Sequence, residues 1–478
     1  MIKPLYSLAL FTTLILFITA CESGPDAPGE SDAELPALAT SAPLLVDYDR
    51  NVYIPNLDDL VRTLEVAFVY NSDSIQVRYR YATDTPSWYH QYLIYENGDW
   101  VRYGGGGAGP DPHGLYEDRI SMQLDDGSVD GFAQLGGFVT IHPGMRTLTN
   151  EASGDDVASH PYLGDELGRD DVRKFIPESR EGDMEEGEQW HQTRGPDEID
   201  RLRDDGVFLD LWQWRAHRSN PLGYADNGYV LEYRHGSEGT GMYTDNRDDE
   251  GRPRYMFDPD ITGRLALRKD SLIDRHYGQD DPYFIFEGNA IPFDPDHDWQ
   301  EGDAIPQRFL QEPEGSRGAL KADGYWEDGA WHLSVTRTLE APDPRDSKAL
   351  EEGGTYHVAF AVHADGSGAR WHYVSVPYAL GIGDTDGASP TLRASHTDGP
   401  LQDADVEWTE IPVFYPGQVD YSWLLSPDHP GHYFVQEGEM HMLQIHQIER
   451  LSKYIVRQEL ELLGEDPSEY GMDELRSW

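Results

Sequence analysis

The sequence predicts a mainly β protein: a β-sandwich with helical insertions and a C-terminal helical tail. Apolar and polar residues alternate along several short segments, as they do in strands that bury one face of a sheet. Clusters of Gly, Pro, Asp and Asn separate these segments and indicate turns. Many short alternating strands with frequent turns are typical of antiparallel sandwiches.

The clearest predicted strand covers residues 75–81, where Ile, Val and Tyr alternate with Gln and Arg. It follows the apolar residues 64–70 across Asn71–Ser74, so the two segments predict an antiparallel hairpin. The same alternation predicts strands at residues 331–336 and 356–362.

Three segments depart from the strand pattern. Residues 155–174 and 196–218 carry helical spacing and many charges, so we interpret both as helical insertions on the β framework. Apolar residues at steps of three and four predict a longer helix over residues 436–464.

The first 20 residues have the pattern of a lipoprotein signal peptide. Lys3 precedes an apolar run over residues 5–18, and Ile18–Cys21 resembles a bacterial lipobox. We expect cleavage before Cys21 and lipid attachment to its sulfur; Glu22 at the next position fits sorting to the outer membrane, facing the periplasm. The alternative is a plain secretory signal in which the cysteine is accidental.

The remaining chain divides into three predicted parts. Residues 21–43 are rich in Gly, Pro, Ala and Ser and lack aromatics, so we expect a flexible tether. Residues 44–400 form the predicted β-sandwich domain, and residues 401–478 form a C-terminal extension. No segment after the signal is apolar enough to predict a membrane span, so the membrane contact we expect is the lipid anchor alone.

Charge and cysteine content exclude several functions. The formal net charge is −51, spread along the chain, which argues against binding to nucleic acid and is typical of adaptation to high salt. Because the sequence holds one cysteine, it can form no internal disulfide, cysteine zinc site or iron–sulfur cluster.

One stretch combines flat aromatic side chains with cations. Residues 209–226 read Leu-Asp-Leu-Trp-Gln-Trp-Arg-Ala-His-Arg-Ser-Asn-Pro-Leu-Gly-Tyr-Ala-Asp. These residues suit a pocket for a large, flat anionic ligand. They equally suit a tryptophan-anchored core whose arginines pair with nearby carboxylates.

Five segments together carry a family resemblance: residues 116–122 (Tyr-Glu-Asp-Arg-Ile-Ser-Met), 142–146 (His-Pro-Gly-Met-Arg), 167–174, 211–226 and 356–383. The sequence resembles the ethylbenzene dehydrogenase-related haem-binding family, the gamma-subunit-like domain associated with DMSO-reductase-type molybdoenzymes. The resemblance covers roughly residues 44–464. It implies a β-sandwich that carries one haem as an electron carrier, with a molybdoenzyme complex or another redox protein as partner.

The haem-attaching cysteines of covalent relatives are missing. Those relatives read Gly-Cys-Trp-Leu-Thr-Cys-His-x-Gly-Met-Arg, whereas Gly137 and Ile141 stand at the cysteine positions here and His142 is retained. A noncovalent, b-type haem is therefore what the resemblance implies. His142 is the first axial-ligand candidate. Met145, also a candidate, lies too near in sequence to take the opposite face.

The opposite axial ligand would come from elsewhere in the chain. The sequence offers Met122, His217 and His372, and Lys174 as a weaker candidate. Cations that could pair with the haem propionates are Arg146, Arg215 and Arg218.

A second degenerate motif lies in the C-terminal extension. His429-Pro430-Gly431 precedes residues 442–446, where Met442 and Ile445 occupy the thiol positions of a C-x-x-C-H motif and His446 remains. His446, with His429 or His441, is the candidate ligand of a second haem. Alternatively, both sites have lost haem.

The sequence thus predicts a lipid-anchored, exported haem protein that transfers electrons and has no catalytic centre of its own. The rival interpretation is a haem-less ligand-binding module on the same sandwich, similar to carbohydrate-binding domains.

Overall fold

The computed structural model describes residues 45–47, 52–54, 61–83, 85–105, 115–133, 136–137, 154–172, 174–181, 190–364, 372–385 and 390–414. Contacts divide the chain into two units, Met1–Thr40 and Ser41–Trp478, and every described residue belongs to the second. The helix predicted at residues 436–464 lies outside the described residues. None of the described helices is both long and apolar enough to cross a bilayer.

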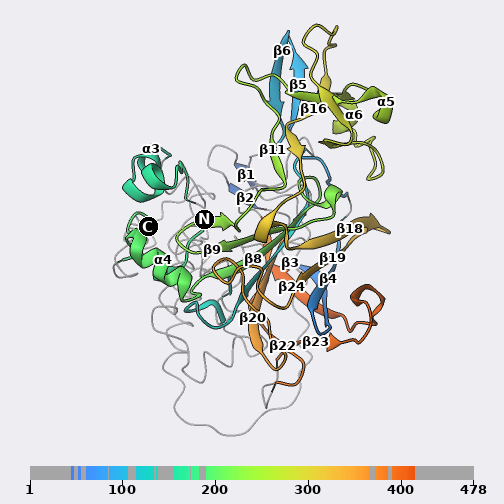
Figure 1. Cartoon of the computed structure of the whole chain (residues 1–478). Helices are drawn as coiled ribbons and strands as arrows, with labels where there is room; N and C mark the ends of the chain where they lie inside the picture. The colour runs from blue at the N-terminus through green and yellow to red at the C-terminus, as the bar shows by residue number, and fades with distance from the viewer. Residues whose placement is uncertain are drawn as a thin grey trace, which may run out of the picture. The chain divides into compact units, whose positions relative to one another are not determined.

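The described residues form one 13-stranded sheet and four smaller sheets (Figure 1). The large sheet runs in the order β10 (Arg234–Gly236), β9 (Asp226–Val230), β8 (Leu209–Arg215), β7 (Arg119–Asp125), β20 (Thr355–His363), β21 (Tyr373–Val374), β24 (Thr409–Phe414), β3 (Val61–Tyr70), β4 (Ser74–Ala82), β19 (Ala330–Thr338) and β18 (Lys321–Glu327). Strand β22 (Tyr378–Ile382) pairs with β20 and β23 (Leu392–His396), and β23 also pairs with β3. The sheet therefore continues past residue 400.

The predicted hairpin and strands are confirmed. Strands β3 and β4 pair antiparallel, with Tyr70 opposite Ile75, and the amide of Asn71 donates to the carbonyl of Ser74 in the turn. Strand β19 adds to β4 along its whole length, and β20 contains the predicted residues 356–362. Along β4 the apolar side chains are buried and the two arginines between them are partly exposed, as the alternation requires, while Gln76 is buried as well.

The two halves of the large sheet pack face to face and enclose the main core. Tyr79 of β4 lies against Phe360 of β20, with ring centroids 6.0 Å apart. Trp214 of β8 lies against Trp331 of β19 at 5.0 Å, and all four residues belong to one buried cluster. This sheet-on-sheet packing confirms the mainly β, sandwich-like fold.

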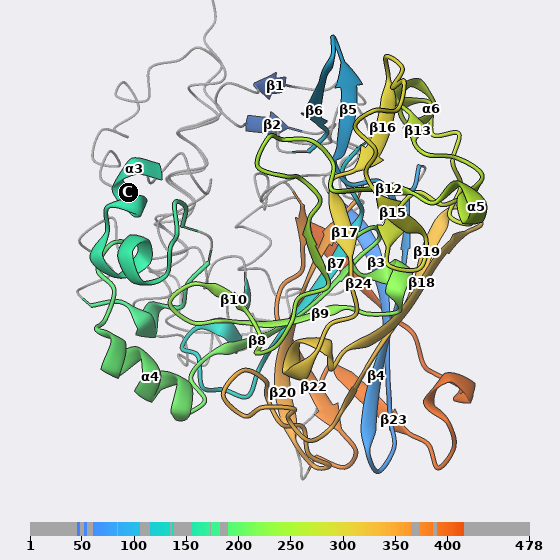
Figure 2. The same ribbon diagram turned by 45° about the horizontal axis from the view of Figure 1, so that its top comes forward.

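The smaller sheets gather chiefly residues 88–103 and 243–310. They are β13–β16–β5–β6 (Leu267–Arg268, Asp303–Pro306, Tyr92–Glu96, Asp99–Tyr103), β11–β17–β14 (Tyr243–Asp245, Arg308–Leu310, Ile285–Phe286), β12–β15 (Tyr255–Phe257, Ala290–Pro292) and β1–β2 (Leu45–Asp47, Val52–Ile54). Figure 2 shows β5, β6 and β16 beside one another at one end of the sandwich. A second apolar cluster forms here, and Trp88 packs against both this cluster and the main core.

Short helices interrupt the strands. They are α3 (Gly154–Ala158), η2 (Pro161–Glu166), η3 (Pro177–Ser179), α4 (Pro196–Asp204), η4 (Asn220–Leu222), α5 (Pro259–Thr262), α6 (Lys269–Ile273), η5 (Gly315–Gly318) and η6 (Leu401–Asp403). Helices α3 and η2 account for part of the predicted insertion at residues 155–174.

The predicted helix over residues 196–218 is wrong beyond its first half. Helix α4 ends at Asp204, and Gly206 adopts a positive φ of 77°, a conformation that glycine adopts without the steric cost of a Cβ. Strand β8 follows, and all seven of its residues are buried. Leu211 packs into a third apolar cluster on one face, and Trp212 packs into the main core on the other. Burial on both faces removes the alternation that would have identified the strand.

Candidate functional site

Strands β7, β8 and β20 present one face to the main core. Their second face is apolar at one end, where Leu211 and Ala359 belong to the third cluster, and polar at the other. Met122 of β7 lies on the core side, directly opposite Trp212 and Phe360 in the sheet register, and is 1% exposed. These neighbours are large and apolar, so Met122 packs as a core residue. The described residues around it leave no space for a porphyrin.

Residues at alternate positions form the polar face, which we define as Arg119, Ser121, Gln123, Gln213, Arg215, Ala361 and His363. In the register, Arg119 lies between Arg215 of β8 and His363 of β20. Ser121 lies similarly between Gln213 and Ala361. These positions carry small or polar side chains, and nearly all of them are buried although they face away from the main core. Buried polar side chains of this number are unusual.

His372 joins the polar face beside His363. Strand β21 pairs Tyr373 with Val362, and one position further on the two imidazoles stack with centroids 4.2 Å apart and planes within 16°. Both histidines are 5% exposed. Of the axial-ligand candidates Met122, His217 and His372, it is thus His372 that lies on the polar face.

Gly136 and Gly137 place the start of the His142 motif on the same face. A Cβ on Gly136 would lie 3.2 Å from Cδ of Pro377, five residues after His372. A Cβ on Gly137 would lie 1.5 Å from Oε1 of Gln123. The side chain of Gln123 therefore fills the space that a residue larger than glycine would need at position 137.

Several predicted site residues lie outside the described residues: Cys21, His142, Met145, Arg146, His429, His441 and His446. Their predicted roles in lipid attachment and haem binding therefore stay predictions.

The described arginines of the tryptophan-rich stretch already have carboxylate partners. Nη1 of Arg215 lies 2.5 Å from Oδ2 of Asp226, and Nε of Arg218 donates to Oε1 of Glu117. Oε2 of Glu117 also accepts the backbone N–H groups of His217 and Arg218 at 2.7 and 2.8 Å. Of the two interpretations of this stretch, the structure supports the tryptophan-anchored core with paired arginines.

His217 is fully buried, and its position differs from that of His372. Its Nδ1 lies 3.1 Å from the carbonyl oxygen of Trp88, so Nδ1 must carry the proton and Nε2 the lone pair. The rings of His90, Tyr92 and Tyr283 lie 5.7–6.1 Å from it, centroid to centroid. Aromatic rings thus surround the imidazole of His217. The described residues leave no space for a haem macrocycle beside it.

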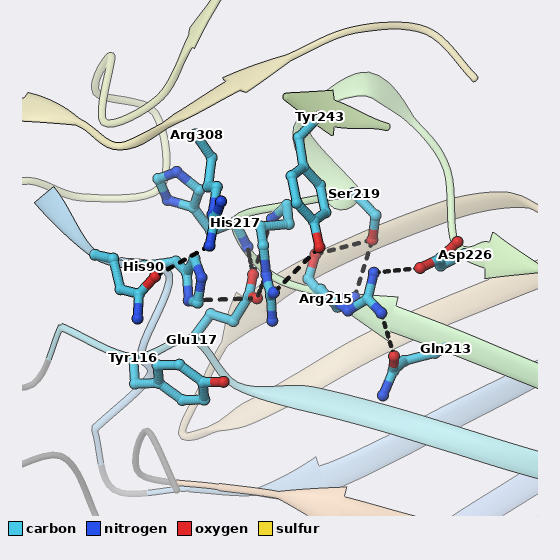
Figure 3. Close-up of polar contacts among 12 residues, drawn as sticks. His90, Tyr116, Glu117, Gln213, Arg215, His217, Ser219, Asp226, Tyr243 and Arg308 are labelled. Atoms are coloured by element: carbon cyan, nitrogen blue, oxygen red, sulfur yellow. Dashed lines mark hydrogen bonds and ion pairs between the residues drawn. The ribbon is translucent and has the colours of Figure 1, made fainter. Parts of the chain in front are cut away.

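A polar cluster that the sequence did not predict surrounds Glu117 (Figure 3). His90 lies with Nδ1 3.7 Å from Oε1 of Glu117, and Nη1 of Arg218 donates to the Tyr243 hydroxyl at 3.4 Å. Arg308 of β17 completes the cluster, with its guanidinium carbon 5.4 Å from the centre of the Tyr243 ring. Of these residues only Glu117 and Arg218 belong to segments that the sequence singled out.

Electrostatics differ between the histidines and the tyrosine of this cluster. Burial lowers the pKa of His217 to about 4 and that of His90 well below its ordinary value, so both imidazoles are neutral at pH 7. Burial alone would raise the pKa of Tyr243, but Arg218 and Arg215, with Arg308, lower it to about 8. The potential around the phenol is therefore positive.

Two comparisons with known proteins bear on this arrangement. The family model described as "Ethylbenzene dehydrogenase" matches residues 31–375. A 69-residue stretch is 32% identical to "Cytochrome c-552" of Stutzerimonas stutzeri; it makes up 14% of this chain and spans 23% of the relative. The chain thus spans about a quarter of the curated relative it matches. Because the family model covers well over half of the sequence, the predicted resemblance is confirmed, and the chain belongs to the ethylbenzene dehydrogenase family.

Proposed function

We propose that this chain is a haem-binding electron-transfer protein of the cell envelope, held to the membrane by lipid on Cys21. Membership of the ethylbenzene dehydrogenase family and the short stretch shared with a cytochrome both support a haem-related role. The haem would be noncovalent, because the only cysteine belongs to the proposed lipid anchor.

The observation that carries the proposal is the meeting of Gly136–Gly137 with the polar face that holds His372. His142 follows Gly137 by five residues, and five residues span at most about 17 Å. A span of this length would allow His142 to approach the polar face, and His142 and His372 would then be the residues that hold the haem iron. Met122 and His217 are weaker candidates for the opposite ligand, because the first lies in the core and the second is enclosed by aromatic rings.

The chemistry of the polar face fits a porphyrin. Ala361 is small, and Ser121 beside it is held by a hydrogen bond from Nε2 of Gln213 to its hydroxyl at 3.1 Å, so polar side chains line the approach to this face. Stacking on His363 fixes the plane of the His372 ring, which is how a supporting side chain orients an axial ligand. Arg119 lies directly opposite His363 in the register. Burial lowers the pKa of Arg119, so a propionate carboxylate beside it would favour the charged form of the guanidinium.

Bound haem would supply one-electron transfer, and the chain would hold it, exclude water and set its potential through ligands and burial. We propose no bond-making step for this chain. Its partner would be a redox protein or a molybdoenzyme-type complex in the envelope, which is consistent with its family.

Titration of the purified mature chain with hemin tests the proposal. We expect a saturable Soret band at one haem per chain, and a pyridine haemochrome of unsubstituted protohaem. A protein that stays colourless through the titration would contradict haem binding and favour a haem-less binding module on the same sandwich.

A further inference from the structure

The polar cluster around Glu117 holds an excess of positive charge inside a strongly acidic protein. The guanidinium groups of Arg215, Arg218 and Arg317 bind two buried carboxylates, those of Glu117 and Asp226. Arg308 adds a further cation beside Tyr243. Asp226 is shared between Arg215 and Arg317. The chain as a whole carries a formal charge of −51, so the local sign is opposite to that of the molecule.

A third carboxylate does not remove this excess. Asp245 lies 3.8 Å from Nη1 of Arg308, but its carboxylate also binds Arg247 at 2.6 Å. The pair of Asp245 and Arg247 is therefore neutral by itself. Nη2 of Arg308 also donates a hydrogen bond to Oε1 of Gln91 at 3.4 Å, and this amide carries no charge.

Two of these guanidinium groups flank one phenol. The guanidinium carbons of Arg218 and Arg308 lie 5.5 and 5.4 Å from the centre of the Tyr243 ring, and Nη1 of Arg218 reaches the hydroxyl at 3.4 Å. Arg308 and Tyr243 keep partial exposure, which gives a solute a route to the cluster.

Several buried nitrogens of the cluster make no hydrogen bond to the described residues. They are both ring nitrogens of His90, Nε2 of His217, Nε of Arg215 and Nε of Arg308. His90, His217 and Arg215 are at most 2% exposed. Nε2 of His217 carries the lone pair of its ring and is an acceptor, whereas Nε of Arg215, Nε of Arg308 and one ring nitrogen of His90 are donors. Each unsatisfied buried donor costs roughly 1–3 kcal/mol, so three such donors in one place indicate a group that the chain itself does not supply.

We propose that Arg218, Arg308 and Tyr243 form a binding site for an oxyanion, a carboxylate or phosphate group, with His90 as an additional neutral donor. Guanidinium forks match the two oxygens of such a group, and the phenol hydroxyl and imidazole N–H donate to it without adding charge. A single anion would balance the positive excess and satisfy donors that are now without partners. The site is independent of the proposed haem ligands and does not require haem.

Calorimetric titration of the haem-free mature chain with sodium phosphate, at ionic strength held constant with sodium chloride, tests the site. We expect saturable 1:1 binding with a dissociation constant near or below about 1 mM. Arg308→Gln should weaken binding at least tenfold. Arg252→Gln removes an arginine paired with Asp248 outside the cluster and should leave the affinity unchanged.

Tyr243→Phe is the second variant, in case loss of Arg308 unfolds the chain. It should also weaken phosphate binding, and a thermal melt will show that each variant is folded. A wild-type titration without saturation, or heats identical in chloride and phosphate, would overturn the proposal, as would full affinity in both variants.

The same titration on hemin-loaded protein identifies the source of the anion. If phosphate binding is lost, a haem propionate occupies the site; if it persists, the site takes a free anion. Either result supports the oxyanion site.

Discussion

The imidazole of His372 stacks on that of His363, 4.2 Å away, although the two lie nine positions apart in sequence. Antiparallel pairing of β20 with β21 creates this contact, because it sets the two histidines side by side on the polar face. The segment that follows His372 reaches Gly136, because a Cβ on that glycine would lie 3.2 Å from Cδ of Pro377. This relationship is the structural basis of the proposed haem site.

Met122→Leu should leave haem binding unchanged. A leucine has nearly the volume of methionine, so the core should lose less than about 1.5 kcal/mol of stability. The Soret position and haem stoichiometry of the hemin-loaded variant should equal those of the wild type. A shifted or lost Soret band in a folded Met122→Leu protein would identify Met122 as a ligand and contradict our interpretation of it as a core residue.

His217 should make the fold sensitive to acid. Its pKa is lowered by burial to about 4, while an imidazole in the unfolded chain takes up its proton near pH 6.5. The unfolded state therefore binds more protons between these values, and the free energy of unfolding falls as the pH falls from 6.5 to 4. The loss from this group is about 3 kcal/mol.

The measurement is denaturant unfolding of wild-type and His217→Gln proteins across this pH range. Subtracting the two curves removes the contribution of the many carboxylates, and the wild type should show the steeper loss. His332→Gln changes a partly exposed histidine of β19, serves as control and should follow the wild type. Parallel curves for wild type and His217→Gln would show that His217 is not held neutral.

The ion pair between Arg337 and Asp210 should be essential for stability. Both side chains are fully buried, with Nη1 2.5 Å from Oδ2, and Asp210 also accepts the backbone N–H of Lys348. Arg337→Met would leave a buried carboxylate without its cation and should cost about 3–5 kcal/mol.

The matched control is Arg345→Met, because Arg345 forms exposed ion pairs with Asp200 and Asp204. Exposed pairs contribute about 0–1 kcal/mol. Chemical denaturation of both variants gives the comparison. Equal costs for the two substitutions would contradict the role assigned to burial.

Sequence patterns predicted those elements whose burial is one-sided. Strand β19 and most of β4 alternate buried and more exposed side chains, so the period of two is visible. Strand β3 was recognised as the apolar run joined to β4 by a turn, although residues 66–70 are all buried. Strand β8 was missed because both of its faces are covered, and its charged neighbours in α4 extended the apparent helix.

The candidate sites could be predicted only in part, since they are assembled from distant segments. His372 was a candidate from its motif, but its partner His363 follows from strand pairing. His90, Tyr243 and Arg308 belong to three segments without any shared pattern, and packing of the smaller sheets against the sandwich brings them together. Long-range packing of this kind leaves no periodic signal in a single sequence.

The spectrum of hemin-loaded His372→Ala tests the central claim most directly. We predict that the wild type gives a low-spin haem spectrum, that His372→Ala and His142→Ala each convert it to high spin, and that His332→Ala does not. A folded His372→Ala protein that binds hemin with an unchanged low-spin spectrum would contradict the placement of haem on the polar face.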